Sequence, residues 1–262
     1  MKFSSGYVKG EADYGVFPNL SNGKMRIFGA TTEPATADAA ETGTLLGELT
    51  LAGGAYTAET RAEYKITLSG SSGSVDTIKV GAFGILPAAV NFITDLNTTA
   101  AAVATAINNS HRGIKFPARS SGADVFVKVP PATGTLFNAI TITTTATTMS
   151  ATVAGDATPS GSGGTVGIAA VNGINFQYPP VSGVLTKETG LWQDSSANAS
   201  GSSVYARILL DGADDFSSST VYRRIQLSIG TSGADITSQI LTTVIGTPIT
   251  LSVGTYTIPA SA

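Results

Sequence analysis

The sequence has 262 residues, of which 42% are hydrophobic and 13% charged, and its formal net charge is −3. This composition allows a sizeable core and excludes a fully disordered chain, while the absence of a basic stripe leaves nucleic-acid binding without electrostatic support. The absence of cysteine excludes disulfides, thiol catalysis and thiolate metal sites.

The composition also predicts the fold class. Thr, Ser, Gly, Ala and Val dominate the sequence; Thr and Val favour strands, whereas Gly and Ser favour turns. No apolar run approaches the roughly 20 residues that a membrane span needs, and residues 1–15 lack the apolar stretch of a signal peptide. We therefore expect a mainly β protein with neither a membrane nor a nucleic acid as partner.

The first strands are expected near the N-terminal end. KMRIFGA at residues 24–30 has a short strand pattern, and TLLGELTLAGG at residues 44–54 has a second one that glycines close. The residues between these segments are mostly polar. This end of the chain therefore supplies two strands to a β domain.

The region from Tyr64 to Val153 has a different organisation. Residues 63–70 and 74–83 alternate apolar and polar side chains around a Gly/Ser loop, which predicts a hairpin. Further strand patterns follow at residues 114–120, 123–131 and 138–156, and in the second of them alternate residues are valine. The order β-β-α-β-β is typical of a small α+β domain with one helix on a sheet.

Only one helix is predicted, and it lies inside this region. Its apolar stripe has the spacing i, i+3, i+4 and i+7 and comprises Ala100, Val103, Ala104 and Ile107. Thr98 or Thr99 is the expected N-cap, and Asn108 and Asn109 supply the expected end.

The stretch GDATPSGSGG, residues 155–164, is the most linker-like part of the chain, because its ten small or polar residues include four glycines. Short strand patterns resume after it and are typical of a sandwich or barrel. The two N-terminal strands can complete the same sheets. We therefore predict a discontinuous antiparallel β-sandwich or barrel domain of residues 1–59 plus 162–262, with residues 60–161 inserted as an α+β domain.

Several motifs follow one another in the outer segments. Residues 25–51 read MRIFGATTEPATADAAETGTLLGELTL, and they are followed much later by VNGINF, GVLTKETGLW, RRIQLSIGTSGADI and a closing YTIPASA. This order resembles that of a family of small virion proteins of tailed bacteriophages, also common in prophages. The resemblance covers about residues 24–55 and 165–262, and in the short family members the first segment continues directly into the second.

The central block also resembles phage sequences. GSVDTIKVGAFGIL, from Gly73, and VNFITDLNTTAAAVATAINN, from Val90, resemble a module that is inserted in various phage structural proteins. The two resemblances together imply a virion structural protein that anchors through its outer domain and carries the module as an insertion.

Few residues are candidates for chemistry. The only histidine, His111, would need partners to act as a base or a metal ligand, and an incidental position after a helix is the plainer interpretation. Asp211, Asp214 and Asp215 could offer oxygen ligands to a hard cation such as Ca²⁺. Their spacing does not match an EF-hand, and a polar loop explains them equally. We expect no catalytic residue, no cofactor and no metal, with these three aspartates as weak metal candidates.

Three further residues are candidates for an interface. Arg223 and Arg224 are adjacent in a strand pattern and therefore point to opposite faces. One of them pairs with an acidic neighbour or lies at an interface, and a solvated sheet edge explains the two arginines equally. Trp192 is the only tryptophan, and it belongs to the core, to an interface or, as a further alternative, to a sugar-binding platform.

The resemblance and the lack of paired titratable groups together predict function. We expect a non-enzymatic virion structural protein, assembled in the host bacterial cytoplasm, that forms homo-oligomers and docks on capsid or tail subunits. A capsid decoration or minor head protein is the first hypothesis, and a tail or neck (collar) component is the second. A third alternative is a receptor- or glycan-binding module, whose aromatic cluster would come from Tyr64, Phe83, Phe92, Phe116, Phe126 and Phe137.

Overall fold

The chain divides into two compact units: unit 1 comprises Met1–Ala58 and Ala170–Ala262, and unit 2 comprises Glu59–Ala169. The sequence pattern places the corresponding boundaries after residues 59 and 161. Unit 2 ends later in the sequence than the pattern predicts, because Thr165 and Ile168 pair with Glu63 and Thr60 inside unit 2. The computed structural model describes residues 1–14, 21–29, 32–110, 115–152, 158–161, 163–177, 184–210, 212, 214–237, 242–251 and 255–257.

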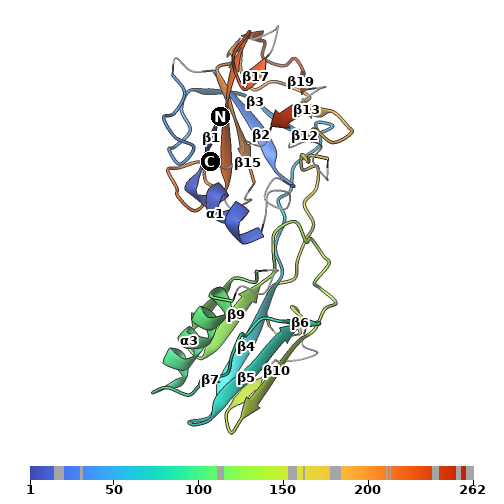
Figure 1. Ribbon diagram of the computed structural model, residues 1–262. Helices are drawn as coiled ribbons and strands as arrows, with labels where there is room; N and C mark the ends of the chain where they lie inside the picture. The colour runs from blue at the N-terminus through green and yellow to red at the C-terminus, as the bar shows by residue number, and fades with distance from the viewer. Residues whose placement is uncertain are drawn as a thin grey trace. The chain divides into compact units, whose positions relative to one another are not determined.

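Unit 1 is built on one eight-stranded sheet with the order β1-β16-β15-β2-β3-β13-β19, in which β17 also pairs with β16 (Figure 1). Only the pair of β16 and β17 is parallel among the described strands of this sheet. The strands are β1 (Lys2–Phe3), β2 (Lys24–Gly29), β3 (Thr44–Leu51), β13 (Trp192–Asp194), β15 (Tyr205–Leu209), β16 (Arg224–Gly230), β17 (Ile236–Thr237) and β19 (Ile249–Leu251). Two short antiparallel pairs accompany the sheet: β12 (Val184–Thr186) with β20 (Thr255–Thr257), and β14 (Gly201–Ser202) with β18 (Thr242–Thr243).

This sheet joins the two ends of the sequence. β2 pairs with β15, and β3 pairs with β13, so neighbouring strands come from either side of unit 2 in the sequence. The mainly β, discontinuous and antiparallel fold class is thereby confirmed. Its sheets are sandwich-like, and the described strands close no barrel.

The apolar face of the sheet forms the core of unit 1. Because strand side chains alternate between faces, each of the three central strands contributes every second residue: Met25 and Ile27, Ala206 and Ile208, Ile225 and Leu227. Leu46, Leu49, Phe176 and Trp192 pack into the same cluster. On their opposite face the same strands carry several buried polar side chains.

Helix α1 (Ser5–Tyr14) corrects the expectation of a single helix. Its sequence contains two glycines and no apolar stripe, so periodicity gave no signal. Contacts with distant residues hold it instead. The buried Ser4 hydroxyl accepts the amide of Tyr7 at 3.0 Å, as an N-cap does, and a Cβ on Gly6 would lie 2.2 Å from the carbonyl oxygen of Val221.

The described residues of unit 2 form two four-stranded antiparallel sheets and one helix. The first sheet has the order β10-β5-β6, with β7 also on β5, and the second has the order β11-β4-β9-β8. The elements are β4 (Glu63–Ser69), β5 (Ser74–Val80), β6 (Phe83–Gly84), β7 (Val90–Asn91), α3 (Leu96–Asn108), β8 (Ala118–Ser121), β9 (Asp124–Lys128), β10 (Ile142–Thr147) and β11 (Ser150–Thr152).

The predicted hairpin of the first two strands of unit 2 is wrong. β4 pairs with β9 and β11, whereas β5 pairs with β10, β6 and β7, so the chain passes from one sheet to the other between them. Alternation identified the buried face of each strand but carries no information on its neighbour. In the connection between β4 and β5, the backbone at Gly73 passes close to Thr147. Glycine is required there, because its φ is +97° and a Cβ would lie 1.9 Å from the carbonyl oxygen of Thr147.

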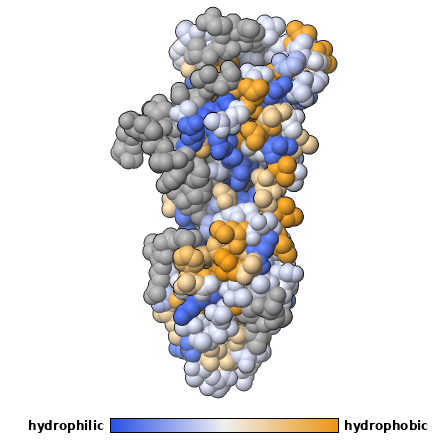
Figure 2. Space-filling view, turned by 90° about the vertical axis from the view of Figure 1, so that its right-hand side faces the viewer, coloured by the Kyte–Doolittle hydropathy of each residue, from blue (hydrophilic) through white to orange (hydrophobic). Residues whose placement is uncertain are grey.

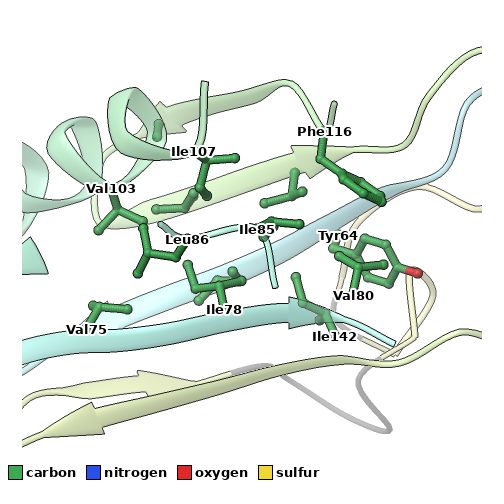
Figure 3. Packing of buried hydrophobic residues seen from close by; sticks show 14 of the residues in the cluster. Tyr64, Val75, Ile78, Val80, Ile85, Leu86, Val103, Ile107, Phe116 and Ile142 are labelled. Carbon is green, nitrogen blue, oxygen red and sulfur yellow. The ribbon is translucent and has the colours of Figure 1, made fainter. Parts of the chain in front are cut away.

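The core of unit 2 lies between α3 and the strands (Figure 3). Val103 and Ile107 point from α3 toward Ile85 and Leu86, and β5 closes the other side with its buried residues Val75, Ile78 and Val80. The predicted apolar stripe of the helix is confirmed, since its four residues are buried.

The start of α3 differs from the expectation. Asp95 is the N-cap, and its Oδ1 accepts the amide of Thr98 at 2.8 Å. Asp is as good a cap as Thr. With Asp95 as N-cap, the helix begins about one turn earlier than it would with the expected cap, Thr98 or Thr99. Thr99 lies inside the helix, where its hydroxyl donates to the Asp95 carbonyl oxygen at 2.7 Å. The predicted end is confirmed, with Asn108 as last residue and Asn109 as C-cap.

We predict that Asp95 makes unit 2 sensitive to acid. The hydrogen bonds from Thr98 lower the pKa of Asp95, so the stability that it contributes is present above the unfolded pKa and is lost as the pH falls through the folded pKa. Asp95→Ala should lower the melting temperature at neutral pH, whereas Asp95→Asn should keep the cap and flatten the acid dependence. Equal melting curves of all three proteins at neutral and acidic pH would contradict this role.

We also predict that residues 59–169 fold when expressed alone, because unit 2 has its own core. The measurement is thermal unfolding followed by circular dichroism together with a two-dimensional NMR spectrum. A cooperative transition and dispersed amide signals are expected. Val103→Ala in this fragment should lower the transition, and a collapsed spectrum of the unmodified fragment would contradict the prediction.

Candidate functional site

The polar face of the unit 1 sheet gathers buried cations in a row. Arg207 on β15 lies opposite Arg26 on β2 and opposite Gln226 on β16. Arg224 lies two residues before Gln226, on the same face of β16. Arg207 and Arg224 are both 0% exposed. Buried charges of this kind need hydrogen-bonded partners.

The loop that follows β2 supplies several of these partners through its backbone. Arg207 donates from Nη1 to the carbonyl oxygen of Ala39 at 2.7 Å and from Nη2 to that of Thr36 at 3.2 Å. Gln226 donates to the carbonyl oxygen of Pro34 at 2.7 Å and accepts from Arg207 at 2.8 Å. We call residues 34–42 the motif loop, because they are PATADAAET of the sequence motif.

Amides of the motif loop also have partners outside the loop. Glu41 donates to the carbonyl oxygen of Phe216 at 3.2 Å, and Thr42 donates to the Tyr205 hydroxyl at 3.0 Å. The Tyr205 hydroxyl in turn donates to the Thr42 carbonyl oxygen at 2.6 Å. The motif loop is therefore fixed on the sheet through both its carbonyls and its amides.

Arg224 forms the most buried ion pair of the described residues, and its partner is Asp214. Its Nε and Nη2 donate to the two carboxylate oxygens of Asp214 at 2.7 and 2.5 Å, and the side chains are 0% and 1% exposed. Burial disfavours the guanidinium charge, but the hydrogen bond and charge of Asp214 outweigh it and raise the pKa of Arg224. The pairing of one of the two arginines with an acidic neighbour is thus confirmed.

The aspartate candidates for a metal are used differently in the structure. Both carboxylate oxygens of Asp214 bind Arg224, and Oδ1 also accepts the amide of Phe216 at 2.8 Å. Asp215 accepts from the Ser217 hydroxyl at 2.7 Å, as in a polar turn. Asp211 lies outside the described residues, as does His111. Within the described ranges no three acidic or histidine side chains gather as a metal site would require.

A second acid in this cluster is less well compensated. Glu41 pairs with Arg26, whose guanidinium lies 3.8 Å from the centre of the Phe216 ring. Its other oxygen, Oε1, is buried and has no hydrogen-bond partner in the part of the chain that the structure describes. Burial therefore raises the pKa of Glu41, although Arg26 and Arg207 act in the opposite direction.

The three interface candidates are mostly interior. Trp192 is 2% exposed and meets the edge of Phe176, with 5.2 Å between the ring centres. Arg224 is buried against Asp214, and Arg223 donates to the carbonyl oxygen of Leu210 at 2.8 Å. The structure places Trp192 and Arg224 in the interior of unit 1 instead of on its surface, so neither a sugar platform nor a partner surface can use them.

The aromatic residues considered for ligand binding do not form an open cluster. Tyr64, Phe116 and Phe137 lie in the core of unit 2, and burial raises the pKa of Tyr64 to about 12. Phe126 lies under the guanidinium of Arg119 at 3.9 Å, and Phe83 is 45% exposed. On the face of the molecule in Figure 2, hydrophobic residues form separate patches among hydrophilic ones.

The cluster as a whole is an anchor, because its fully buried arginines are hydrogen-bonded and because Arg207 and Gln226 donate to the motif loop. It is closed to solvent at Arg207 and Arg224. The partners of this cluster lie far apart in the sequence, and of its residues sequence reasoning singled out only Arg224 and Asp214. It missed Arg26 and Arg207, which their alternation with apolar strand residues could have indicated. It also missed Glu41, which lies in a loop and has no such pattern.

Comparison with protein-family models, with curated proteins and with solved structures finds no match to this chain. Neither of the two helices in the described ranges has the length and apolar character of a membrane span.

We predict that Arg224 and Asp214 are strongly coupled. Arg224→Met leaves a buried carboxylate unpaired and should lower the free energy of unfolding by about 3–5 kcal/mol. The double variant Arg224→Met/Asp214→Leu should cost clearly less than the two single changes combined, since it leaves no unpaired charge. Urea unfolding measures all four proteins, and additive costs would contradict the coupling.

We predict that Glu41 makes unit 1 less stable as the pH rises. Because the folded pKa is raised, the stabilising effect of protonation is complete below the unfolded pKa and is lost as the pH rises through the folded pKa. Glu41→Gln should therefore gain stability relative to the unmodified chain as the pH rises from the ordinary pKa of a glutamate through the raised pKa of Glu41. Urea unfolding over this range is the measurement, with Glu188→Gln at an exposed position as control. A pH-independent difference would contradict the prediction.

Proposed function

We propose that the chain is a non-enzymatic structural protein of the bacteriophage virion, a capsid decoration or minor head protein. It acts by self-assembly and by docking on other virion proteins, and it assembles in the cytoplasm of the host bacterium. A tail or neck component is the second candidate, since the motifs are common to the family and do not select a location.

One observation carries the proposal. The motif segments that resemble the phage family, residues 25–51 and 223–236, fall in unit 1, where β2, β3 and β16 belong to one sheet. The resemblance covers residues 24–55 and 165–262, and the residues between these two stretches, 56–164, belong to unit 2 from Glu59 onward. A sequence resemblance that follows the division of the fold supports a common architecture, with an additional unit inserted at one point.

The motif loop supports the same proposal. It forms the first part of the motif PATADAAETGTLL, and its backbone carbonyls accept from Arg207 and Gln226. A family that keeps this loop and these strands together keeps the same anchor. The polar cluster offers stability rather than a reaction centre, which favours a role in contact over a role in catalysis.

The glycan-binding alternative receives less support. Its predicted aromatic cluster is largely interior: Tyr64 and Phe116 lie in the core, and only Phe83, whose ring centre lies 6.3 Å from that of Phe116, is 45% exposed among these three. Stacking on a sugar requires exposed ring faces that converge on one site.

The test is the location of the chain in purified virions of a phage that encodes it. We expect stoichiometric recovery of the chain by mass spectrometry and gold labelling of the head by antibodies raised against it. Labelling of the tail or neck would favour the second candidate. Absence of the chain from virions that contain the other structural proteins would overturn the proposal.

A further inference from the structure

An apolar turn stands at the surface of unit 1. The amide of Thr247 donates to the carbonyl oxygen of Val244 at 3.1 Å, and Gly246 has φ of +81°, as the third residue of a type II turn requires. Val244 is 53% exposed and Ile245 is 62% exposed. Exposed turns are usually built from polar residues, so two neighbouring aliphatic side chains here need an explanation.

The turn is held rigidly. Its residue Ile245 donates its amide to the Ser200 hydroxyl at 2.9 Å. Gly246 donates to the carbonyl oxygen of Ala197 at 2.9 Å, and Ala197 donates to that of Thr247 at 2.9 Å. The two side chains are therefore presented at a fixed place, which lowers the entropy that a partner must overcome on binding.

A pocket of about 450 Å³ lies in the same part of unit 1, because residues 247–251 line it. Its apolar wall comprises Met25, Ile27, Leu49, Ile229, Ile249 and Leu251. Ile229, Ile249 and Leu251 remain half-buried at the margin of the core. The pocket thus leaves part of the apolar core of unit 1 accessible, and its volume is in the range of pockets that hold ligands.

The pocket and the turn share one electrostatic property. No residue that lines the pocket is charged, and the sequence contains no Asp, Glu, Lys or Arg after Asp235. A charged group buried in this pocket would find no counter-charge there, and its desolvation would oppose binding. The lack of charge disfavours a charged occupant, and the apolar wall, beside the serine and threonine side chains that complete the lining, favours an uncharged aliphatic group.

We propose that the pocket receives the Val244–Ile245 turn of a second copy of the chain. The turn provides two aliphatic side chains without a charge, and the pocket provides an aliphatic wall without a charge. Because turn and pocket belong to neighbouring residues of one unit, a two-fold axis allows each copy to insert its turn into the other. This inference rests on the proposed self-assembly and names the contact.

The size of the contact predicts its strength. Two side chains bury much less than the roughly 800 Å² per partner of a standard stable interface. The contact is therefore weak between isolated pairs of molecules and becomes effective when many copies are held together. A method that captures weak contacts covalently is required to detect it.

Disulfide capture between full-length chains tests the proposal, and the absence of native cysteine removes background. One copy carries Ile245→Cys in the turn, and a second copy with a different tag carries Thr250→Cys, which is exposed and lines the pocket. Mild oxidation of the mixture should link the two tags several-fold more than a control in which Ser72→Cys, exposed in unit 2, replaces Ile245→Cys. Adding Val244→Ser to the turn copy should return the yield to the control level.

The outcomes separate this inference from the proposed function. Linkage no higher than in the Ser72→Cys control, with all variants folded by circular dichroism, overturns the self-docking contact. Linkage that Val244→Ser leaves unchanged also overturns it, because the turn side chains then play no part. If the chain is recovered in virions but shows no specific linkage, the self-docking contact is rejected and the proposed function stands. If the linkage is specific but the chain is absent from virions, the contact stands and the proposed function is rejected.

Discussion

The fold of unit 1 depends on the burial of arginine side chains on one face of its central strands. Arg207 and Arg224 are fully buried, and a buried charge without partners would cost several kcal/mol. The compensation comes from two loops: the motif loop offers carbonyl oxygens to Arg207, and Asp214 offers both its carboxylate oxygens to Arg224. The loops can leave the sheet only by exposing these charges, so the arginines determine where the loops lie.

This constraint connects segments that are distant in the sequence. The motif loop precedes unit 2, whereas the strands that hold it, β15 and β16, follow unit 2. The anchor therefore forms only when both outer segments have met in one sheet. Unit 2 does not contribute to the anchor, because its residues belong to a separate core. Insertion of a unit between the two segments thus leaves the anchoring contacts intact, as the proposed virion role of unit 1 requires.

The sequence predicted the features that depend on a local residue pattern. It did not predict the elements and pairings that depend on contacts between distant residues. Strand alternation identified the buried faces of β4, β9 and β16, and helical spacing identified the stripe on α3. Helix α1 escaped because contacts of Gly6 and Ser4 with residues near 221 stabilise it. The pairing of β4 and β5 was wrong because alternation does not specify a neighbour. Arg224 and Asp214 lie ten residues apart, and no pattern indicates that they meet.

Hydrogen exchange of the motif loop in Arg207→Met tests the central claim most directly. The amides of Glu41 and Thr42 are bonded to residues outside the motif loop, and in the unmodified chain we expect them to exchange as slowly as those of β15. Loss of the guanidinium should release the loop carbonyls, so that both amides exchange much faster while the β15 and β16 amides stay protected. Equal protection of Glu41 and Thr42 in the two proteins would contradict the account, because the motif loop would then hold its place without the arginine.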